Sequence, residues 1–124
     1  MNSKRPVNLD ITTIRLPLTA YTSILHRISG VILFVGIAFL LYGLDLSLGS
    51  KEGFEQLKEC LQSPVAKFIA WGLLSALAYH LVAGVKHLFM DIGIGEGKAS
   101  GVVGAKLTIA VSAALIVLAG VWVW

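Results

Sequence analysis

Three long runs without charged side chains alternate with shorter polar segments along this chain. The runs cover residues 28–44, 68–85 and 107–124, are 17, 18 and 18 residues long, and contain no Asp, Glu, Lys or Arg. The hydrocarbon core of a bilayer is about 30 Å thick, and an α-helix needs about 20 mostly apolar residues to cross it. With flanking residues included each run is long enough, so the pattern predicts three transmembrane helices.

Helix-breaking and capping residues around these runs predict where the helices begin and end. We expect the helices at about 23–48, 64–90 and 102–124. Gly49 signals the end of the first, and Pro64 suits the first turn of the second because a proline there loses no hydrogen bond. Residues 52–61 have the composition of a short amphipathic turn. The connection before the third helix is rich in glycine: Gly93, Gly95, Gly97 and Gly101.

The first 22 residues are more polar than the rest of the chain. Pro6 and Pro17 disfavour one continuous helix there, because proline lacks the backbone N–H and restricts the residue before it. We therefore expect an extended N-terminal arm over residues 1–22 that runs along the membrane surface or a partner protein. The hydroxyl of Thr22 or Ser23 is expected to cap the first helix.

The composition supports a membrane protein with a single domain, residues 1–124. Hydrophobic residues make up 56% of the chain, charged residues make up 14%, and the mean hydropathy is +0.83. A soluble domain of this length would leave much of that apolar surface in water. The expected fold class is all-α, an integral membrane bundle of three transmembrane helices that run up, down and up. The first run also starts too far from the N-terminus for a cleaved signal peptide.

The positions of Lys and Arg predict the orientation in the membrane. Four such residues, Lys4, Arg5, Arg15 and Arg27, precede the first run, whereas each of the two connections holds three. Cytoplasmic segments carry the excess of positive side chains, so we expect a cytoplasmic N-terminal arm and second connection in a bacterial inner membrane. The net charge of +3 then reflects membrane topology, and no feature of the sequence indicates nucleic-acid binding.

One histidine lies deep inside the second run. Gly72, Ala76, His80 and Gly84 recur at steps of four residues, and His87 returns to nearly the same side of the helix. A stripe of small residues is typical of close helix packing, with the histidine hydrogen-bonded to a neighbouring helix. It also fits an axial haem ligand, since small residues let a porphyrin approach the backbone. The stripe alone leaves both interpretations open.

A haem held by two imidazoles needs a second histidine. His87 is on the same helix as His80 and about 10 Å further along, so these two cannot lie on opposite faces of one porphyrin. His26 and His87 are both expected near the cytoplasmic end, beside charged residues and not across a helix interface from His80. The second ligand is therefore predicted to come from another subunit.

Ser23, His26 and Arg27 form a second polar group at the start of the first helix. Their spacing of three and four residues puts the Ser23 hydroxyl and the Arg27 guanidinium on one side of the helix. In the simpler interpretation, Arg27 reaches anionic lipid head groups and Ser23 is a cap. In the other, these donors lie in the same leaflet as His80 and bind haem propionates and a quinone head group.

Three segments of the chain resemble a known family. They are Arg5, Pro6 and Val7, the stretch 23–30 (SILHRISG) and the stretch 80–93 (HLVAGVKHLFMDIG). Together they resemble the cytochrome b large anchor subunit of succinate dehydrogenase, respiratory complex II. The resemblance extends over almost the whole chain and includes the three-span layout.

The resemblance implies roles for individual residues. His80 matches the axial ligand of haem b, and Ser23 and Arg27 match residues that line the ubiquinone site of that family. His26 and His87, together with Arg27, would lie near the haem propionates. These roles are expectations that the family implies.

The resemblance also implies cofactors and partners. Haem b would be shared with a second, small anchor subunit that supplies the other histidine, while FAD and iron–sulfur clusters belong to a flavoprotein and an iron–sulfur subunit. This chain would hold them at the membrane lipids and help to form the site of ubiquinone reduction, as a subunit of succinate dehydrogenase (quinone) without flavin. The alternatives are a fumarate reductase anchor that works with menaquinone, and a structural membrane protein without a cofactor.

Overall fold

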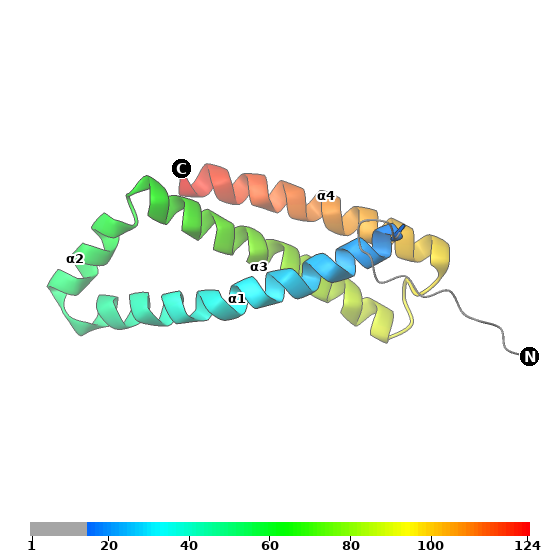
Figure 1. Ribbon diagram of the computed structural model, residues 1–124, viewed down its shortest axis with the longest axis horizontal. Helices are drawn as coiled ribbons and strands as arrows, with labels where there is room; N and C mark the ends of the chain where they lie inside the picture. The colour runs from blue at the N-terminus through cyan, green and yellow to red at the C-terminus, as the bar shows by residue number, and fades with distance from the viewer. Residues whose placement is uncertain (1–14) are drawn as a thin grey trace, which may run out of the picture.

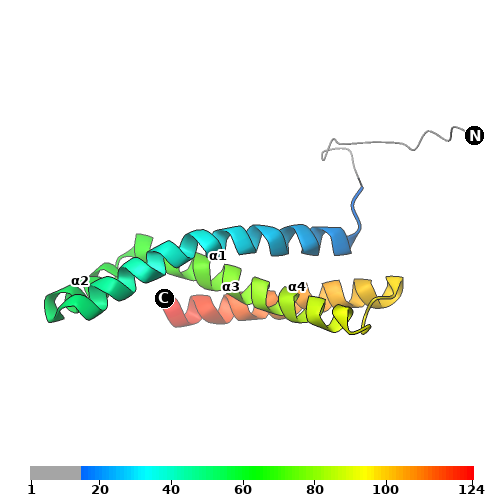
Figure 2. The ribbon, with the colours of Figure 1, turned by 90° about the horizontal axis from the view of Figure 1, so that it is seen from below.

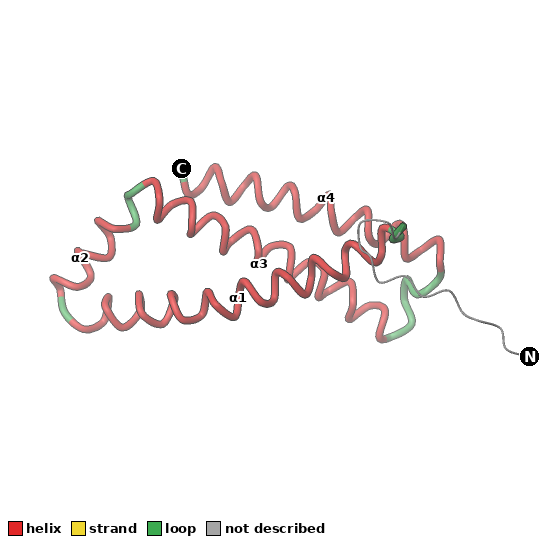
Figure 3. Tube along the Cα trace, viewed as in Figure 1, coloured by secondary structure: helices red, strands yellow, loops and turns green. Residues whose placement is uncertain are grey.

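Helices make up almost all of the part of the chain that the computed structural model describes, residues 15–124. In chain order they are α1 (Leu18–Gly49), α2 (Lys51–Cys60), α3 (Pro64–Asp91) and α4 (Lys98–Val123). These residues contain no strand (Figure 3). α1, α3 and α4 are each long and apolar enough to cross a membrane, which confirms the predicted all-α bundle with three spans.

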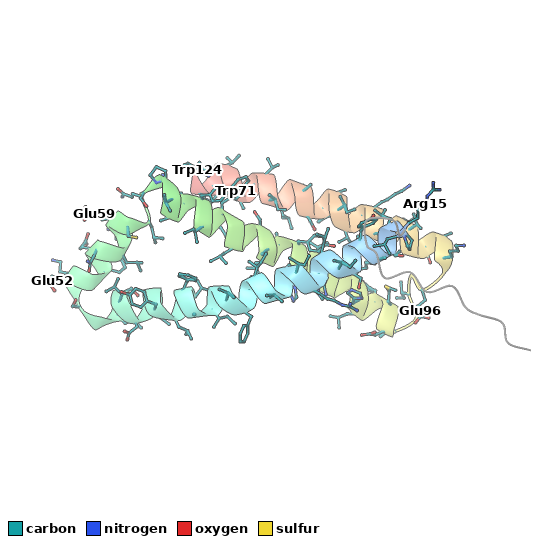
Figure 4. All side chains as sticks on the ribbon, in the orientation of Figure 1. Arg15, Glu52, Glu59, Trp71, Glu96 and Trp124 are labelled. Carbon is teal, nitrogen blue, oxygen red and sulfur yellow. The ribbon has the colours of Figure 1, made fainter. Side chains whose placement is uncertain are left out.

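The three long helices lie alongside one another in an elongated bundle (Figure 1). α3 packs against both α1 and α4. The start of α1, the end of α3 and the start of α4 share one end of the bundle, and α2 and the C-terminus lie at the other (Figures 1 and 2). Arg15 and Glu96 lie at the first end and Glu52 and Glu59 at the second, with the spans between them (Figure 4). This is the predicted up-down-up order.

α1 begins earlier than the sequence predicts. Its first residue is Leu18, so the prediction of an extended arm over residues 1–22 is wrong for its last five positions, and most of the rest lies outside the described residues. Pro17 is the N-cap and has an extended conformation, which suits a residue without a backbone N–H. The predicted cap by Thr22 or Ser23 is therefore wrong. The Thr22 hydroxyl donates instead to a carbonyl of its own helix, 2.9 Å away.

The connection between the first two spans follows the prediction at its ends and contains an additional helix. α1 ends at Gly49, close to the predicted position. Ser50 caps α2, because its hydroxyl accepts a hydrogen bond from the Gly53 N–H at 2.9 Å. The predicted short turn is thus a helix of 10 residues. Pro64 lies in the first turn of α3 as predicted, and the Ser63 hydroxyl accepts a backbone N–H there at 3.2 Å.

α4 also begins earlier than predicted, at Lys98 instead of residue 102. The turn before it is made by Gly93 and Gly95, whose φ angles of 87° and 78° lie in the left-handed region that favours glycine. The prediction that Gly101 belongs to this connection is wrong, since it is buried inside α4. Its small size serves packing, because a methyl group of α1 lies 3.7 Å from the position that a Cβ would take.

Small and weakly polar residues fill the interior of the bundle. The buried residues of the described chain are Thr22, Ser29, Gly36, Gly53, Ala76, Ala83, Gly101, Ala105, Thr108 and Ser112. Large side chains face outward, and Phe34, Leu48 and Trp122 are 78%, 77% and 81% exposed. Lipid tails are as apolar as leucine, so no hydrophobic driving force brings helices together in a membrane. The helices associate instead through close packing, which small residues allow. This distribution of side chains is that of a membrane bundle.

A tryptophan joins α3 to α4 near the end that carries α2. The indole N–H of Trp71 donates to the Ile116 carbonyl oxygen at 2.9 Å. Gly120 makes room for the indole, because a Cβ there would lie 3.1 Å from Nε1. Trp124 lies at the same end (Figure 4), with the Lys67 ammonium 5.8 Å from the centroid of its ring. Tryptophan is typical of the membrane interface, so these contacts fit the end of a span.

Gly53 allows α2 to lie against α1, and its replacement tests how this end of the bundle is held. A Cβ at this position would collide with the backbone carbonyl oxygen of Leu46. We expect Gly53→Ala to lower the free energy of unfolding by about 1–3 kcal/mol, measured by denaturant titration in detergent micelles. Gly49→Ala is the matched control, because no atom lies within 4 Å of its Cβ position. Equal stability of the two variants would contradict the role of this contact.

Candidate functional site

The three histidines of the chain lie together where α1 crosses α3. The rings of His26, from α1, and His80, from α3, are stacked, with centroids 4.2 Å apart and planes 8° from parallel. The ring of His87 is tilted and its centroid lies 5.0 Å from that of His26. The prediction that His26 does not lie across a helix interface from His80 is therefore wrong.

Two glycines explain this close approach. A Cβ on Gly30 of α1 would lie 3.2 Å from Cε1 of His80, and a Cβ on Gly84 of α3 would lie 3.8 Å from Nε2 of His26. Each glycine thus faces an imidazole of the other helix, and the two backbones can approach closely. The predicted stripe of small residues holds at Gly84 but not at Gly72, which is exposed and has no atom within 4 Å of its Cβ position.

His80 is held through one of its two ring nitrogens. Nδ1 lies 3.0 Å from Oγ of Ser29 and 3.2 Å from the carbonyl oxygen of His26. Within residues 15–124 these are the hydrogen bonds of the ring, and Nε2 forms none. The sequence prediction omits Ser29, although a serine followed by a glycine inside an apolar run is typical of a helix contact.

His26 has a buried ring nitrogen that the neighbouring residues do not satisfy. Its Nε2 is buried and has no hydrogen-bond partner within residues 15–124. Such an atom is costly inside a bilayer, where no water replaces a missing partner. In the same part of the chain, no group of three or more His, Cys, Asp or Glu side chains could hold a metal ion. A metal-containing group here would need donors beyond these side chains.

Ser23 and Arg27 lie one helical turn apart on α1, and His26 lies between them in the sequence. Ser23 is half-buried and Arg27 is exposed. Neither side chain forms a hydrogen bond or an ion pair with another residue in the range 15–124. Within residues 15–124 the hydroxyl and the guanidinium therefore remain available to a ligand, a partner or lipid head groups. Ser23 is not the cap of α1, but lipid contact by Arg27 and ligand binding by the pair both stay open.

A second set of polar contacts joins α1 to α3 beside the histidines. The Tyr79 hydroxyl donates to the carbonyl oxygen of Thr22 at 2.6 Å, and Nζ of Lys86 donates to Oγ1 of Thr22 at 3.4 Å. Thr22 is almost completely buried. Among the described residues Lys86 forms no ion pair with Asp91, the acidic residue at the end of the same helix. Lys86 therefore contributes to the helix interface.

A groove of about 360 Å³ lies between α3 and α4. Its lining is mostly apolar, and Lys86 and Thr108 are among its few polar residues. Val82 and Phe89 also line it, and helical geometry puts them roughly half a turn around α3 from His80. The groove is therefore separate from the cluster of histidines.

Comparison with known proteins identifies the family of this three-span bundle. The sequence model of the family described as the succinate dehydrogenase/fumarate reductase transmembrane subunit matches residues 1–121. The chain belongs to this family. The match extends over all three spans and over the two stretches that carry the histidines, 23–30 and 80–93. It also includes Arg5, Pro6 and Val7, which lie outside the residues that the structure describes.

Three bacterial relatives share one name, the succinate dehydrogenase cytochrome b556 subunit. The protein of Coxiella burnetii is 44% identical over 125 residues, which is 100% of both chains. Those of Paracoccus denitrificans and Rickettsia conorii are 38% and 36% identical, over 73% and 75% of this chain and 70% and 72% of their own length. The predicted family, and the function of a membrane anchor of succinate dehydrogenase, are thereby confirmed.

Tyr79→Phe tests the contact between α1 and α3 beside the histidines. The change removes the hydrogen bond to the Thr22 carbonyl and keeps the ring, so we expect the free energy of unfolding to fall by about 1 kcal/mol. This free energy is measured by titrating the purified complex with SDS in mixed micelles and monitoring its circular dichroism. Tyr42→Phe is the matched control, because Tyr42 is 70% exposed and its hydroxyl has no hydrogen bond within residues 15–124. Equal stability of the two variants would count against this contact.

Proposed function

We propose that this chain is the large anchor subunit of a succinate:ubiquinone oxidoreductase, where it binds haem b jointly with a second anchor subunit and helps to form the quinone-reduction site. The observation that carries the proposal is the state of His80. One ring nitrogen is bonded inside the protein, and the other has no partner within residues 15–124. An imidazole nitrogen with no other partner is what a haem iron accepts as an axial ligand.

The side chains around His80 fit a haem better than a bare metal ion. A bare ion needs three or four protein ligands in one place, and no such group occurs within the described residues. A haem brings its own ring nitrogens, so it needs only axial ligands from protein, and when bound it supplies one-electron transfer. Gly30 and Gly84 allow close contact between the imidazoles and the opposite helix, and Nε2 of His80 has no partner within residues 15–124 that would compete with such a ligand.

The second axial ligand comes, in this proposal, from another polypeptide. Two imidazoles that held one haem would have to lie on either side of it. The rings of His26 and His80 are stacked face to face with centroids 4.2 Å apart, which leaves no room for a porphyrin between them. His87 belongs to the same cluster. A histidine of a second, small anchor subunit therefore completes the pair.

His26, His87 and Arg27 are proposed to interact with the haem propionates. Nε2 of His26 lacks a partner within residues 15–124, and Arg27 is exposed at the same end of the bundle. Carboxylates accept short, strong hydrogen bonds from such donors. The cluster would then hold the polar edge of the haem while His80 holds its iron.

Quinone reduction requires donors that act on the head group, and Ser23 and Arg27 provide them in this proposal. The Ser23 hydroxyl donates a hydrogen bond to a quinone carbonyl oxygen. The Arg27 guanidinium stabilises the negative charge that develops on that oxygen during reduction. Both side chains lie near the start of α1, where the span meets the polar region, so the head group binds there while its tail stays in lipid.

The remaining partners follow from membership in the family. A flavoprotein with FAD and an iron–sulfur subunit carry out succinate oxidation and relay the electrons, and this chain holds them at the membrane without bearing either cofactor. The excess of Lys and Arg before the first span supports an N-terminus on the cytoplasmic side of a bacterial inner membrane. The family description also includes fumarate reductase, so an anchor that works with menaquinone is the alternative.

His80→Leu removes the proposed haem ligand and keeps an apolar side chain in the span. We expect the purified complex to lose its low-spin haem spectrum, or to show it strongly altered, in a dithionite-reduced minus oxidised difference spectrum. His26 is the neighbouring imidazole, so a double variant with His26→Leu excludes it as a substitute ligand. An unchanged low-spin spectrum in the double variant would refute the ligand role of His80.

Ser23→Ala and Arg27→Gln test the quinone site. Loss of a donor to the developing charge should slow quinone reduction by about 100-fold, whereas succinate oxidation with a soluble dye acceptor should continue at the normal rate. Ser47→Ala is the control, because its hydroxyl is exposed near the other end of α1 and, within residues 15–124, bonds to a carbonyl of its own helix. Equal loss of both activities would indicate failed assembly and would speak against a role in quinone binding.

A further inference from the structure

The hydroxyl of Ser29 connects α1 and α3 at His80. Its oxygen lies 2.7 Å from the carbonyl oxygen of His26 and 3.0 Å from Nδ1 of His80, and the same Nδ1 lies 3.2 Å from that carbonyl. Ser29 is 5% exposed, so these atoms form a small network inside the span. The network does not include the quinone pair, and it reaches His80 through Nδ1, the ring nitrogen that is not proposed to bind iron.

The chemistry of the groups determines the direction of these hydrogen bonds. A carbonyl oxygen only accepts, so the single hydrogen of the Ser29 hydroxyl goes to His26 over the shorter distance. The oxygen of Ser29 is then an acceptor toward His80, and the hydrogen between them belongs to Nδ1. The His26 carbonyl oxygen, 3.2 Å from Nδ1, also requires a hydrogen on Nδ1, because it would repel a lone pair there. In the neutral imidazole the lone pair is therefore on Nε2.

We propose that Ser29 is a positioning residue for His80, which holds the imidazole in the tautomer and orientation that direct the Nε2 lone pair to the haem iron. The inference rests on the proposed ligation of haem by His80. A hydrogen bond from the second nitrogen of a ligating imidazole fixes the ring and raises its basicity. A hydroxyl does this without placing an additional charge inside the bilayer, where a carboxylate would be costly.

A role in helix packing alone would not require the contact with His80. Serine hydroxyls in membrane helices commonly bond to a carbonyl of their own helix, and Ser75 does so in α3 at 2.7 Å. Ser29 forms the same kind of bond within α1 and adds the ring nitrogen of another helix. Ser75→Ala is therefore the matched control, since it removes an equivalent part-buried hydroxyl without affecting a histidine.

The test is a redox titration and EPR spectrum of the haem in the purified complex. We expect Ser29→Ala to keep its haem but to raise the midpoint potential and shift the low-spin g values, because an imidazole with a weaker hydrogen bond donates less to ferric iron. A tenfold change in the relative affinity for ferric and ferrous haem, the expected upper size, corresponds to about 59 mV for one electron. Ser75→Ala should match the wild type.

Ser29→Thr keeps a hydroxyl that can bond the same carbonyl, so it should restore the midpoint potential and the g values. Loss of haem in Ser29→Ala with retention in Ser29→Thr would also support the positioning role. Wild-type potential and g values in Ser29→Ala would overturn it. Loss of haem in both variants would overturn it as well, because the position would then tolerate no change of shape whether or not a hydroxyl is present.

Failure of this inference is distinguishable from failure of the proposed function. If the double variant of His26 and His80 keeps an unchanged low-spin spectrum, the proposed ligand is wrong whatever Ser29 does. If that variant loses the spectrum while Ser29→Ala leaves the potential and the g values unchanged, only the role of Ser29 is wrong.

Discussion

Lipid offers no hydrogen bonds, so every polar side chain within the three spans needs a partner in protein. The crossing of α1 and α3 meets this requirement for His80 and Tyr79, although Nε2 of His26 has no partner within residues 15–124. The α1 backbone at His26 and the hydroxyl of Ser29 hold His80 of α3, while Tyr79 of α3 donates back to a carbonyl of α1. Gly30 keeps the two backbones close enough for these contacts. The candidate site depends on this crossing, because the crossing determines where each ring nitrogen of His80 points.

Much of the fold is predictable from the positions of charged residues. A bilayer excludes Asp, Glu, Lys and Arg far more strongly than it distinguishes among apolar residues, so runs without charge mark the three spans. Gly49 and Pro64 also mark helix ends correctly, since their effects on the local backbone do not depend on the surroundings. The start of α4 is not predictable in this way. Gly101 suits either a turn or a close helix contact, and only the neighbouring α1 decides between them.

The candidate site is predictable where it depends on a single helix. Spacing along α3 identifies the face that carries His80, and spacing along α1 groups Ser23 with Arg27. The stack of His26 on His80 is not predictable, because the relative rotation of two helices determines it, and a shift by one residue turns a side chain by about 100°. The role of Ser29 is not predictable for the same reason, since the helix crossing brings its hydroxyl to a second partner, Nδ1 of His80. The ligand and quinone roles remain predictions.

Because large side chains face outward and small ones lie inside, the positions that tolerate substitution differ from those of soluble proteins. In those proteins the large apolar positions are the sensitive ones. Here such side chains face lipid, where one aliphatic residue can replace another without disturbing a helix contact. A single additional methyl group at Ala83 or Ala105, which are 2% and 0% exposed, would force neighbouring backbones apart. Evolutionary variation in this chain should therefore concentrate on its outer surface, and its narrow interior should change little.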